Sequence, residues 1–337
     1  MATDYNKCMK KIMLALGLVI LALAACAPAG TSATYALGTV CSQQVYGGDC
    51  GAAIAEVDAM LLRITGEYAI NGALTGKISS AAPNPAELTD EAAALIGASL
   101  DMAALTGGAF DPTIGPVSVL WDITGNPKVP SRTDVQKALE LVDYNNVRID
   151  GNTVSLAKKG MILDLGGIAK GYAADIAAEI YKKHGIKSAL LNLGGNIYAF
   201  GARKDGKDWR IGIRDPKGQP GEHAAAVAVS DKSVVTSGGY ERFFESGGQT
   251  YHHIFDPYTG YPAQNGLLAV TVICKNSTMA DALSTAFFVM GLDDGLTLAN
   301  RLDAVEAVFF TDQKEVYITD GLKESIEITN ETYTIKS

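Results

Sequence analysis

A short apolar run that passes through two glycines into a long helical pattern constrains the fold most. Residues 161–165 (MILDL) have the length and composition of a buried strand. Gly166 and Gly167 follow directly, and the alanine-rich segment up to Gly185 has helical periodicity with two lysines near its end. The pattern therefore predicts a strand that delivers Asp164 to the start of a helix, and glycine at the entrance of that helix.

The order of the other expected elements indicates the fold class. The chain is expected to contain a strand at 35–46, helices at 50–64, 90–105, 131–142, 279–290 and up to about 302, a hairpin at 147–156, a strand at 189–193, several strands between 209 and 272, and closing strands. Residues 66–86 are rich in Gly, Ala, Ser and Pro and are expected to form a loop. Because strands and helices occur in separate groups more than in strict alternation, the prediction is an α+β fold.

The N-terminus has the pattern of an export signal. Lys10 and Lys11 precede an apolar run, Ile12–Ala25, which is shorter than the roughly 20 residues that a spanning helix needs. The run ends in Leu-Ala-Ala-Cys, which resembles a bacterial lipobox in which Cys26 becomes the lipid-bearing first residue. An ordinary cleaved signal peptide with a chance cysteine is the alternative. We expect residues 1–25 to be a lipoprotein signal peptide, 26–34 a tether, and 35–337 an exported domain held at a bacterial membrane.

Charge and cysteine content narrow the function classes further. The net charge is −9, which argues against a nucleic-acid partner. Apart from Cys8 and Cys26, the chain has only three cysteines, too few for a disulfide framework. A Cys41–Cys50 disulfide is compatible with an oxidising compartment, whereas Cys274 ends an apolar run and is expected to be a buried strand residue.

An acid and a hydroxyl share one face of the expected helix at 279–290. Asp281 and Thr285 are four positions apart in MADALSTAFFVMG, so their oxygens can converge on one point. In one interpretation Thr278 caps the helix and Asp281 reaches back to it, while Thr285 bonds to the preceding turn. In the other interpretation the two oxygens bind a hard divalent cation such as Mg²⁺ or Ca²⁺.

Three more glycine-marked segments could carry chemistry. GAFDPTIG (108–115) contains Asp111-Pro112, which is typical of a turn. DLGGIAKGYAAD (164–175) opens a helix whose free N–H groups favour an anion; Lys170 lies in the first turn and is either solvated or close to something negative. In YHHIFDPYTGYP (251–262) the adjacent histidines point to opposite faces of a strand, so one is expected to face a pocket and the other solvent.

Taken together and in order, these motifs resemble the ApbE family of FAD:protein FMN transferases. The motifs are GAFDPT, DLGGIAKGYAAD, LLNLGGNIYAFG, TSGGYERFF, HHIFDPYTGYP and ADALSTAFFVMG. The resemblance implies mixed and antiparallel sheets with packed helices, in two lobes with the FAD site between them. It also implies Mg²⁺-dependent transfer of FMN from FAD to a Thr or Ser hydroxyl of a target protein, with release of AMP. The implied targets are subunits of membrane redox complexes or secreted flavoproteins.

The resemblance also implies roles for particular residues. Asp281 and Thr285 correspond to side-chain Mg²⁺ ligands, with the Gly167 carbonyl as a third, and Ser284 stands where some members have an additional acid. The residues that correspond to the FAD-binding positions are Leu37, Ala109, Phe110, Asp111, Asp164, Lys170 and Phe255. His253 is our candidate for the base that activates the attacking hydroxyl.

Two other functions are compatible with the same residues. A metal-dependent FAD pyrophosphatase would use water instead of the Thr hydroxyl and would release free FMN and AMP. A lipid-anchored FAD-binding protein would leave FAD intact. Because water and Thr are chemically similar nucleophiles at the same phosphorus, the residues alone separate these functions poorly.

Overall fold

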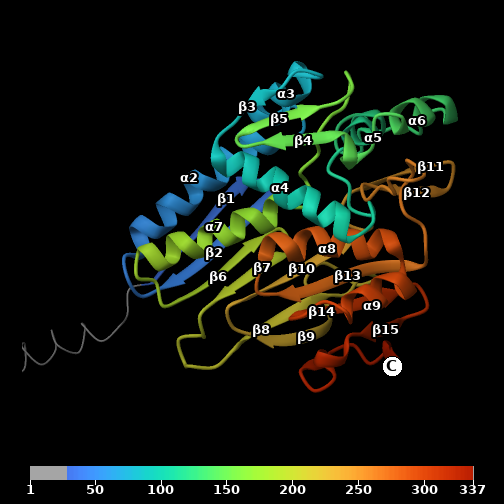
Figure 1. Ribbon diagram of the computed structural model, residues 1–337. Helices are drawn as coiled ribbons and strands as arrows, with labels where there is room; N and C mark the ends of the chain where they lie inside the picture. Colours follow the sequence, from blue (N-terminus) through green and yellow to red (C-terminus); the bar gives the residue numbers. More distant parts are fainter. Residues whose placement is uncertain (1–28, 337) are drawn as a thin grey trace, which may run out of the picture.

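A computed structural model describes residues 29–336, and its centre is one nine-stranded sheet (Figure 1). The strand order is β1-β2-β6-β7-β10-β13-β14-β15-β17, with antiparallel pairing except between β15 and β17. The strands are β1 (Ala29–Ala36), β2 (Thr39–Tyr46), β6 (Ser188–Leu193), β7 (Asn196–Phe200), β10 (Lys232–Gly238), β13 (Leu267–Cys274), β14 (Val305–Thr311), β15 (Glu315–Ile318) and β17 (Thr334–Lys336). The expected signal peptide and Cys26 lie outside the described residues.

Helices cover one face of this sheet and a smaller sheet covers the other. The helices are α2 (Cys50–Tyr68), α3 (Ala73–Ala81), α4 (Asp90–Leu105), α5 (Gly115–Trp121), α6 (Arg132–Leu139), α7 (Ala169–Lys183), α8 (Ser277–Met290) and α9 (Leu292–Ala299), with 3₁₀ turns at Tyr144–Asn146 and Asp320–Leu322. Of these, α2, α7, α8 and α9 pack on the strands (Figure 1). None of the helices within residues 29–336 is long and apolar enough to cross a membrane.

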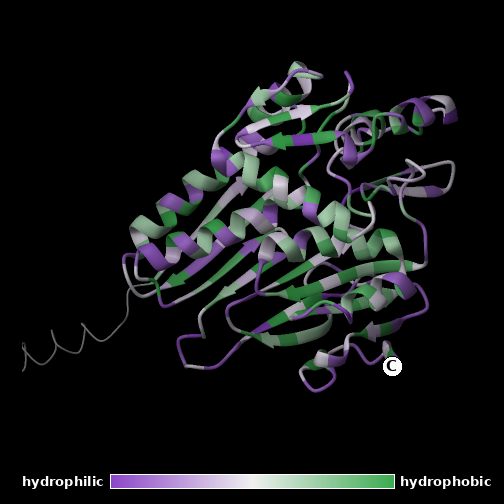
Figure 2. Ribbon diagram, in the orientation of Figure 1, coloured by the Kyte–Doolittle hydropathy of each residue, from purple (hydrophilic) through white to green (hydrophobic). Residues whose placement is uncertain are grey.

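Three small sheets complete the fold. They are β8 (Trp209–Arg214) with β9 (His223–Val229) and β16 (Ile326–Ile328), β3 (Ala86–Glu87) with β4 (Val147–Asp150) and β5 (Thr153–Leu156), and the hairpin β11 (Phe243–Ser246) with β12 (Gln249–His252). Hydrophobic residues concentrate along the central strands and hydrophilic ones in the peripheral loops (Figure 2). The buried clusters lie between these layers, because each layer hides its apolar face against the next.

Helices α7 and α8 touch almost backbone to backbone where they cross. A Cβ atom at Gly171 of α7 would lie 2.1 Å from the backbone oxygen of Ser277 and 2.8 Å from Cβ of Asp281 in α8. No other residue type fits in that space, so glycine allows the close contact. The crossing matters for function because it brings the Gly166–Lys170 segment next to Asp281.

Several local predictions are confirmed. Thr89 and Ser131 cap α4 and α6 through their side chains, and residues 147–156 form the expected hairpin. Cys274 is a buried residue at the end of β13. The α+β prediction holds, with mixed sheets and packed helices.

Other predictions differ from the structure near the N-terminus. The expected strand at 35–46 is a hairpin, because Leu37 and Gly38 both have positive φ and turn the chain between β1 and β2. Residues 29–34, expected as part of a tether, lie in β1. Cys41 and Cys50 are not bonded to each other: Cys41 donates to the Ala36 carbonyl instead, at 3.4 Å.

The expected loop at 66–86 is also largely helical. Helix α2 continues to Tyr68, and α3 occupies residues 73–81. Because many residues of α3 are small, its sequence shows no clear helical pattern. In the structure Ile78 is buried, and the Ser79 hydroxyl donates to the Thr75 carbonyl. Conversely, the expected strand at 161–165 has only one bridge, from Ile162 to Ile114, although Met161, Leu163 and Leu165 are buried.

Candidate active site

A cleft of about 1050 Å³ collects residues from segments far apart in the chain. Its walls come from the β1–β2 turn, the end of α2, residues 109–124, the 164–170 junction and residues 236–257. The predicted site residues that line it are Leu37, Ala109, Phe110, Asp111, Asp164, Gly167, Lys170, His253, Phe255 and Thr285. Asp281, the remaining one, lies just behind the wall and is 2% exposed.

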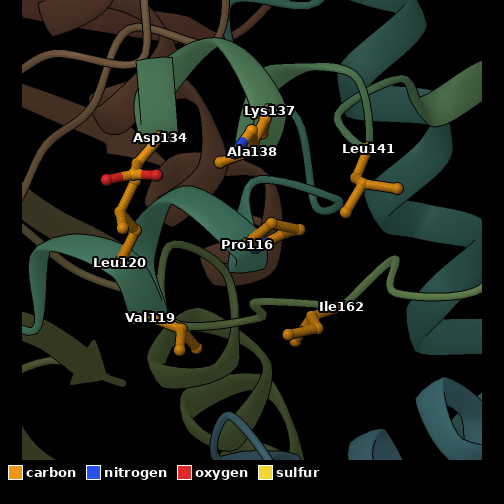
Figure 3. A pocket seen from close by; sticks show the side chains of 8 residues that line it. All are labelled: Pro116, Val119, Leu120, Asp134, Lys137, Ala138, Leu141 and Ile162. Carbon is orange, nitrogen blue, oxygen red and sulfur yellow. The ribbon is translucent and has the colours of Figure 1, made fainter. Parts of the chain in front are cut away.

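A second, smaller cavity of about 370 Å³ lies between α5 and α6 (Figure 3). Its lining is mostly apolar and includes Pro116, Leu120 and Ile162, and its charged residues are Asp134 and Lys137. None of the predicted site residues lines this cavity. The predicted site residues therefore gather at the larger cleft.

The carboxylate of Asp281 does not cap its own helix. Asn276 caps α8 by accepting from the Met279 N–H at 2.8 Å. Asp281 Oδ2 accepts instead from the Gly171 N–H at 2.9 Å, and its Oδ1 lies 3.5 Å from Lys170 Nζ. The capping interpretation of Asp281 is therefore wrong. Its other carboxylate oxygen, Oδ1, lies near the ammonium group of Lys170, which lines the cleft.

Thr285 lies one helical turn beyond Asp281 and faces the same junction. Its Oγ1 is 3.3 Å from Ser237 Oγ, and a Cβ atom added at Gly167 would lie 3.2 Å from it. The Ser284 hydroxyl is buried and pairs with the Asp281 carbonyl and Ser237. Thr285 and the Gly167 backbone are therefore close together, whereas Ser284 turns away.

The oxygen atoms at this junction would suit a hard cation better than a transition metal as ligands. Residues 29–336 contain no group of three or more His, Cys, Asp or Glu that could hold a metal ion. A cation at this junction would have one carboxylate (Asp281), one hydroxyl (Thr285) and one carbonyl (Gly167), and would need other oxygens to fill its shell. Oxygen-only ligands with open positions match Mg²⁺, which usually keeps waters or phosphate oxygens.

Asp175 of α7 holds the start of α8 in place. Its Oδ1 accepts from the Ser277 N–H at 2.9 Å, and its Oδ2 accepts from the N–H and hydroxyl of Thr278 at 2.8 and 2.6 Å. Desolvation raises the pKa of Asp175, and these hydrogen bonds act against the rise. The first N–H groups of a helix have no partner within it, so this carboxylate ties α8, and with it Asp281, to α7.

Asp175→Ala is expected to lower the free energy of unfolding by about 2–3 kcal/mol, because the N–H groups at the start of α8 lose their charged acceptor. Urea unfolding followed by circular dichroism measures the change. Asp175→Asn, which keeps one acceptor oxygen, is the matched control and should lose less. Equal unfolding midpoints for wild type and the Ala variant would show that the contact contributes nothing.

Two predicted FAD-binding acids support the cleft wall. Asp164 accepts from the Gly166 N–H at 2.8 Å and from the Ser118 hydroxyl at 2.7 Å, so it shapes the glycine junction. Asp111 accepts from the N–H and hydroxyl of Thr113 and from the Tyr144 N–H. The turn expected at Asp111 is therefore present, but it is buried, and burial raises the pKa of this carboxyl.

The two histidines have different surroundings. His253 lines the cleft, as expected for one of the pair, but His252 packs edge-on against Phe288 instead of facing solvent. Nδ1 of His253 lies 3.3 Å from the Arg242 carbonyl. A carbonyl oxygen can only accept, so Nδ1 carries the proton and Nε2 keeps a free lone pair. Burial and the nearby Arg242 and Lys170 lower the pKa of His253 to about 3.

An aromatic cluster supports the apolar side of the cleft. Trp121 is fully buried, donates to the Gly260 carbonyl at 2.9 Å and contacts the rings of Phe244, Tyr251 and Phe255. The cluster thus joins α5 to the β11–β12 hairpin and places Phe255 in the wall. Such aromatic packing is suited to holding a flat ring system beside it.

Several lining residues had no assigned role in the sequence. Ser237, Glu241 and Arg242 belong to TSGGYERFF, a motif that carried the resemblance but no residue role. Arg214 ends β8, and its guanidinium lies 4.6 Å from the centre of the Tyr240 ring. Only the motif could have drawn attention to the first three, and nothing in the sequence around Arg214 marks it.

Comparison with known proteins identifies the family. The model of the ApbE family matches residues 37–309. The chain belongs to the ApbE family. An ApbE-family relative, the FAD:protein FMN transferase of Treponema pallidum (strain Nichols), is 36% identical over 323 residues, which are 89% of each chain.

Solved ApbE structures share the fold. The ApbE protein of Thermotoga maritima MSB8 superimposes with a TM-score of 0.82 at 33% identity, over 88% of this chain and 98% of that one. The apo form of the flavinyl transferase ApbE from Pseudomonas stutzeri gives 0.78 at 29% identity, over 89% and 97%. The expected α+β fold of this family is therefore confirmed.

Proposed function

We propose that this protein is an FAD:protein FMN transferase that moves FMN from FAD to a Thr or Ser hydroxyl of a target protein. The acceptor oxygen forms a bond to the FMN-side phosphorus, the P–O bond of the diphosphate breaks, and AMP leaves with the bond's electron pair. The observation that carries the proposal is one cleft lined by Lys170 and His253, with Asp281 just behind its wall, in a chain that is 36% identical to the Treponema transferase.

Mg²⁺ is the proposed cofactor. Asp281, Thr285 and the Gly167 carbonyl would hold it, and when bound it would neutralise charge on the diphosphate and on the departing AMP. The support is the donor set itself: a carboxylate only 2% exposed whose Oδ1 has a cation, Lys170, 3.5 Å away. A buried carboxylate needs such compensation, and a second positive charge nearby would be stabilised by it.

Lys170 and the glycine junction are proposed to bind the diphosphate. Lys170 Nζ also lies 3.3 Å from the Gly166 carbonyl, so the side chain folds over the junction, with 23% of its surface exposed. It is therefore not the freely solvated lysine that one interpretation of the sequence allowed. An ammonium group held next to open backbone at a helix start is suited to a phosphate. These groups let an acidic protein bind an anionic substrate.

His253 is proposed to accept the proton of the attacking hydroxyl. Its neutral ring has Nδ1 occupied by the Arg242 carbonyl, which leaves Nε2 as the proton acceptor. A pKa lowered to about 3 keeps the ring neutral at pH 7, although it also makes the free enzyme's imidazole a weak base. The negative charge that FAD brings would raise this pKa and strengthen the base when it is needed.

His253→Asn is expected to slow FMN transfer by about a hundredfold or more while FAD affinity changes little, because proton acceptance is lost and the binding groups stay. Single-turnover labelling of the acceptor gives the rate, and quenching of flavin fluorescence gives the affinity. Gln249→Asn, at the start of β12 and not among the residues that line the cleft, is the control. Equal transfer rates for wild type and the variant would remove His253 from the mechanism.

One incubation tests the proposed function. The protein is mixed with FAD, Mg²⁺ and a candidate acceptor that bears the Thr, and the products are separated by denaturing electrophoresis and chromatography. Covalent flavin on the acceptor identifies a transferase. Free FMN and AMP would identify an FAD pyrophosphatase instead, and intact FAD a binding protein.

The location and targets of the enzyme are proposed from its N-terminus. The basic start, the apolar run and Cys26 support export and lipid anchoring at the outer face of a bacterial membrane. An anchored transferase would meet acceptor proteins at that surface, so we propose subunits of membrane redox complexes or secreted flavoproteins as targets. A lipid mass on Cys26 in the purified, membrane-extracted protein would be the direct sign.

A further inference from the structure

Glu241 is a carboxylate that lines the cleft without a partner. It lies three residues beyond the end of β10, and within residues 29–336 its carboxylate makes no hydrogen bond or ion pair. The residue is exposed within the cleft, where the surrounding walls displace enough water to raise the pKa of its carboxyl. Lys170, Arg242 and Arg214 attract it electrostatically, but none of them lies within ion-pair distance.

The diphosphate of FAD is a poor partner for this group. Two negative groups close together in one cleft repel each other. A carboxylate can only accept hydrogen bonds when ionised, so its ligand must donate them. Glu241 therefore requires a part of the reaction complex other than the phosphates.

The chain places Glu241 on the proton-accepting side of the cleft. The next residue is Arg242, whose carbonyl receives the His253 N–H at 3.1 Å and lies 3.3 Å from its Nδ1. The attacking hydroxyl must approach close to the base that takes its proton. The segment that carries this hydroxyl must therefore pass near Glu241.

Arg214 presents the complementary group beside it. Its guanidinium is stacked on Tyr240, the residue before Glu241, and it makes no hydrogen bond within the described part of the chain. Its Nε is buried without a partner. Stacking fixes the planar group while its N–H donors stay available, which is the arrangement of a binding arginine rather than a structural one.

We propose that Glu241 and Arg214 form the subsite for the acceptor polypeptide, in which Glu241 accepts from an N–H or another donor of the segment and Arg214 donates to one of its carbonyl or carboxylate oxygens. The inference rests on the proposed transferase function. An extended polypeptide offers N–H and C=O groups within one residue of each other, which suits a carboxylate and a guanidinium in one wall. The ionised diphosphate of FAD has only acceptor oxygens and so offers no such pair.

Two turns that contain glycine border the cleft next to Glu241 and Arg242. Gly195, in the β6–β7 turn, faces Glu241 Oε1, which would be 3.4 Å from an added Cβ atom. A Cβ atom added at Gly38, in the β1–β2 turn, would lie 3.2 Å from Nη2 of Arg242. Both glycines have positive φ, so larger residues would strain the turns and narrow the rim. A chain segment can therefore approach Glu241 over backbone rather than over side chains.

The test compares Glu241→Gln with Glu245→Gln, an exposed glutamate of β11 outside the cleft. The probe is a recombinant, flavin-free acceptor domain that the wild-type enzyme labels, chosen before any variant is tested. For Glu241→Gln, we expect KM for this acceptor to rise about tenfold, the loss of one charge-assisted hydrogen bond. FAD affinity should stay equal or tighten, because a negative charge near the phosphates is gone. Glu245→Gln should match wild type in both.

The outcomes separate the possible errors. Weaker FAD binding with an unchanged acceptor KM would assign Glu241 to the FAD site and overturn the proposal, as would no change in either quantity. Arg214→Gln, made in parallel, should also raise the acceptor KM, and FAD titration shows whether it reaches the phosphates instead. If wild-type protein labels none of a panel of acceptor domains, the transferase function itself fails, whatever the variants do.

Discussion

Asp281→Asn is expected to abolish Mg²⁺-dependent FMN transfer, with a loss of roughly a thousandfold or more in rate. The substitution keeps an oxygen that can accept from the Gly171 N–H, so the α7–α8 contact survives. It removes the one negative charge among the three proposed cation ligands. Rates at saturating FAD and acceptor over a Mg²⁺ titration measure the loss, and much of it should persist at high Mg²⁺.

The control for this variant is Asp294→Asn, on the exposed side of α9. FAD titration without metal gives a second readout: binding to Asp281→Asn should equal or exceed that of wild type, since Lys170 loses its nearby carboxylate and can turn fully to the phosphate. Full transfer activity in Asp281→Asn would place the cation elsewhere and would contradict the proposed reaction centre.

Gly171→Ala is expected to cause the largest loss of stability from a single added methyl group. The new Cβ would lie 2.1 Å from the Ser277 carbonyl oxygen, which belongs to the backbone of α8 and cannot rotate away. Helices α7 and α8 must separate, and overpacking of this kind costs about 3 kcal/mol or more. Activity should fall with stability, because the shift moves Asp281 and Thr285 away from Gly167.

Gly66→Ala in α2 is the matched substitution. Nothing lies within 4 Å of an added Cβ there, and the residue is exposed within the helix. Alanine should therefore stabilise the protein by about 0.5–1 kcal/mol, through its better helix propensity. Denaturant unfolding of both variants checks the pair. Similar midpoints for the two would show that the helices have room at Gly171.

Several parts of the fold were predictable because their signals are local. Thr89 and Ser131 bond to N–H groups three residues away in their own helices, and the turn around Gly151 sets its hairpin. Helix α3 was not predictable in the same way. Its glycine and serine residues have weak helical preference, and the burial of Ile78 stabilises it only after the chain has folded.

The candidate site divides similarly. Ten of the eleven predicted residues line one cleft and the eleventh, Asp281, lies behind its wall. The resemblance to the family, which rests on the order of the motifs and not on any one of them, implied these positions. Arg214 was missed because it ends an ordinary strand, β8, and only packing places it over Tyr240 and beside Glu241. A residue without a local pattern gains its role from its neighbours in space.

The amino-acid sequence by itself determined the family motifs, their order, the helix that carries Asp281 and Thr285, the caps at Thr89 and Ser131, and the hairpin turn at Gly151, since these depend on residues within a few positions of each other. Only the tertiary structure decided what Asp281 contacts. Its partner, the Gly171 N–H, is 110 residues away, and the choice between capping and facing the cleft depends on how closely two helices pack. Such packing is a property of the whole folded chain, because burial and charge pairing exist only once distant segments meet.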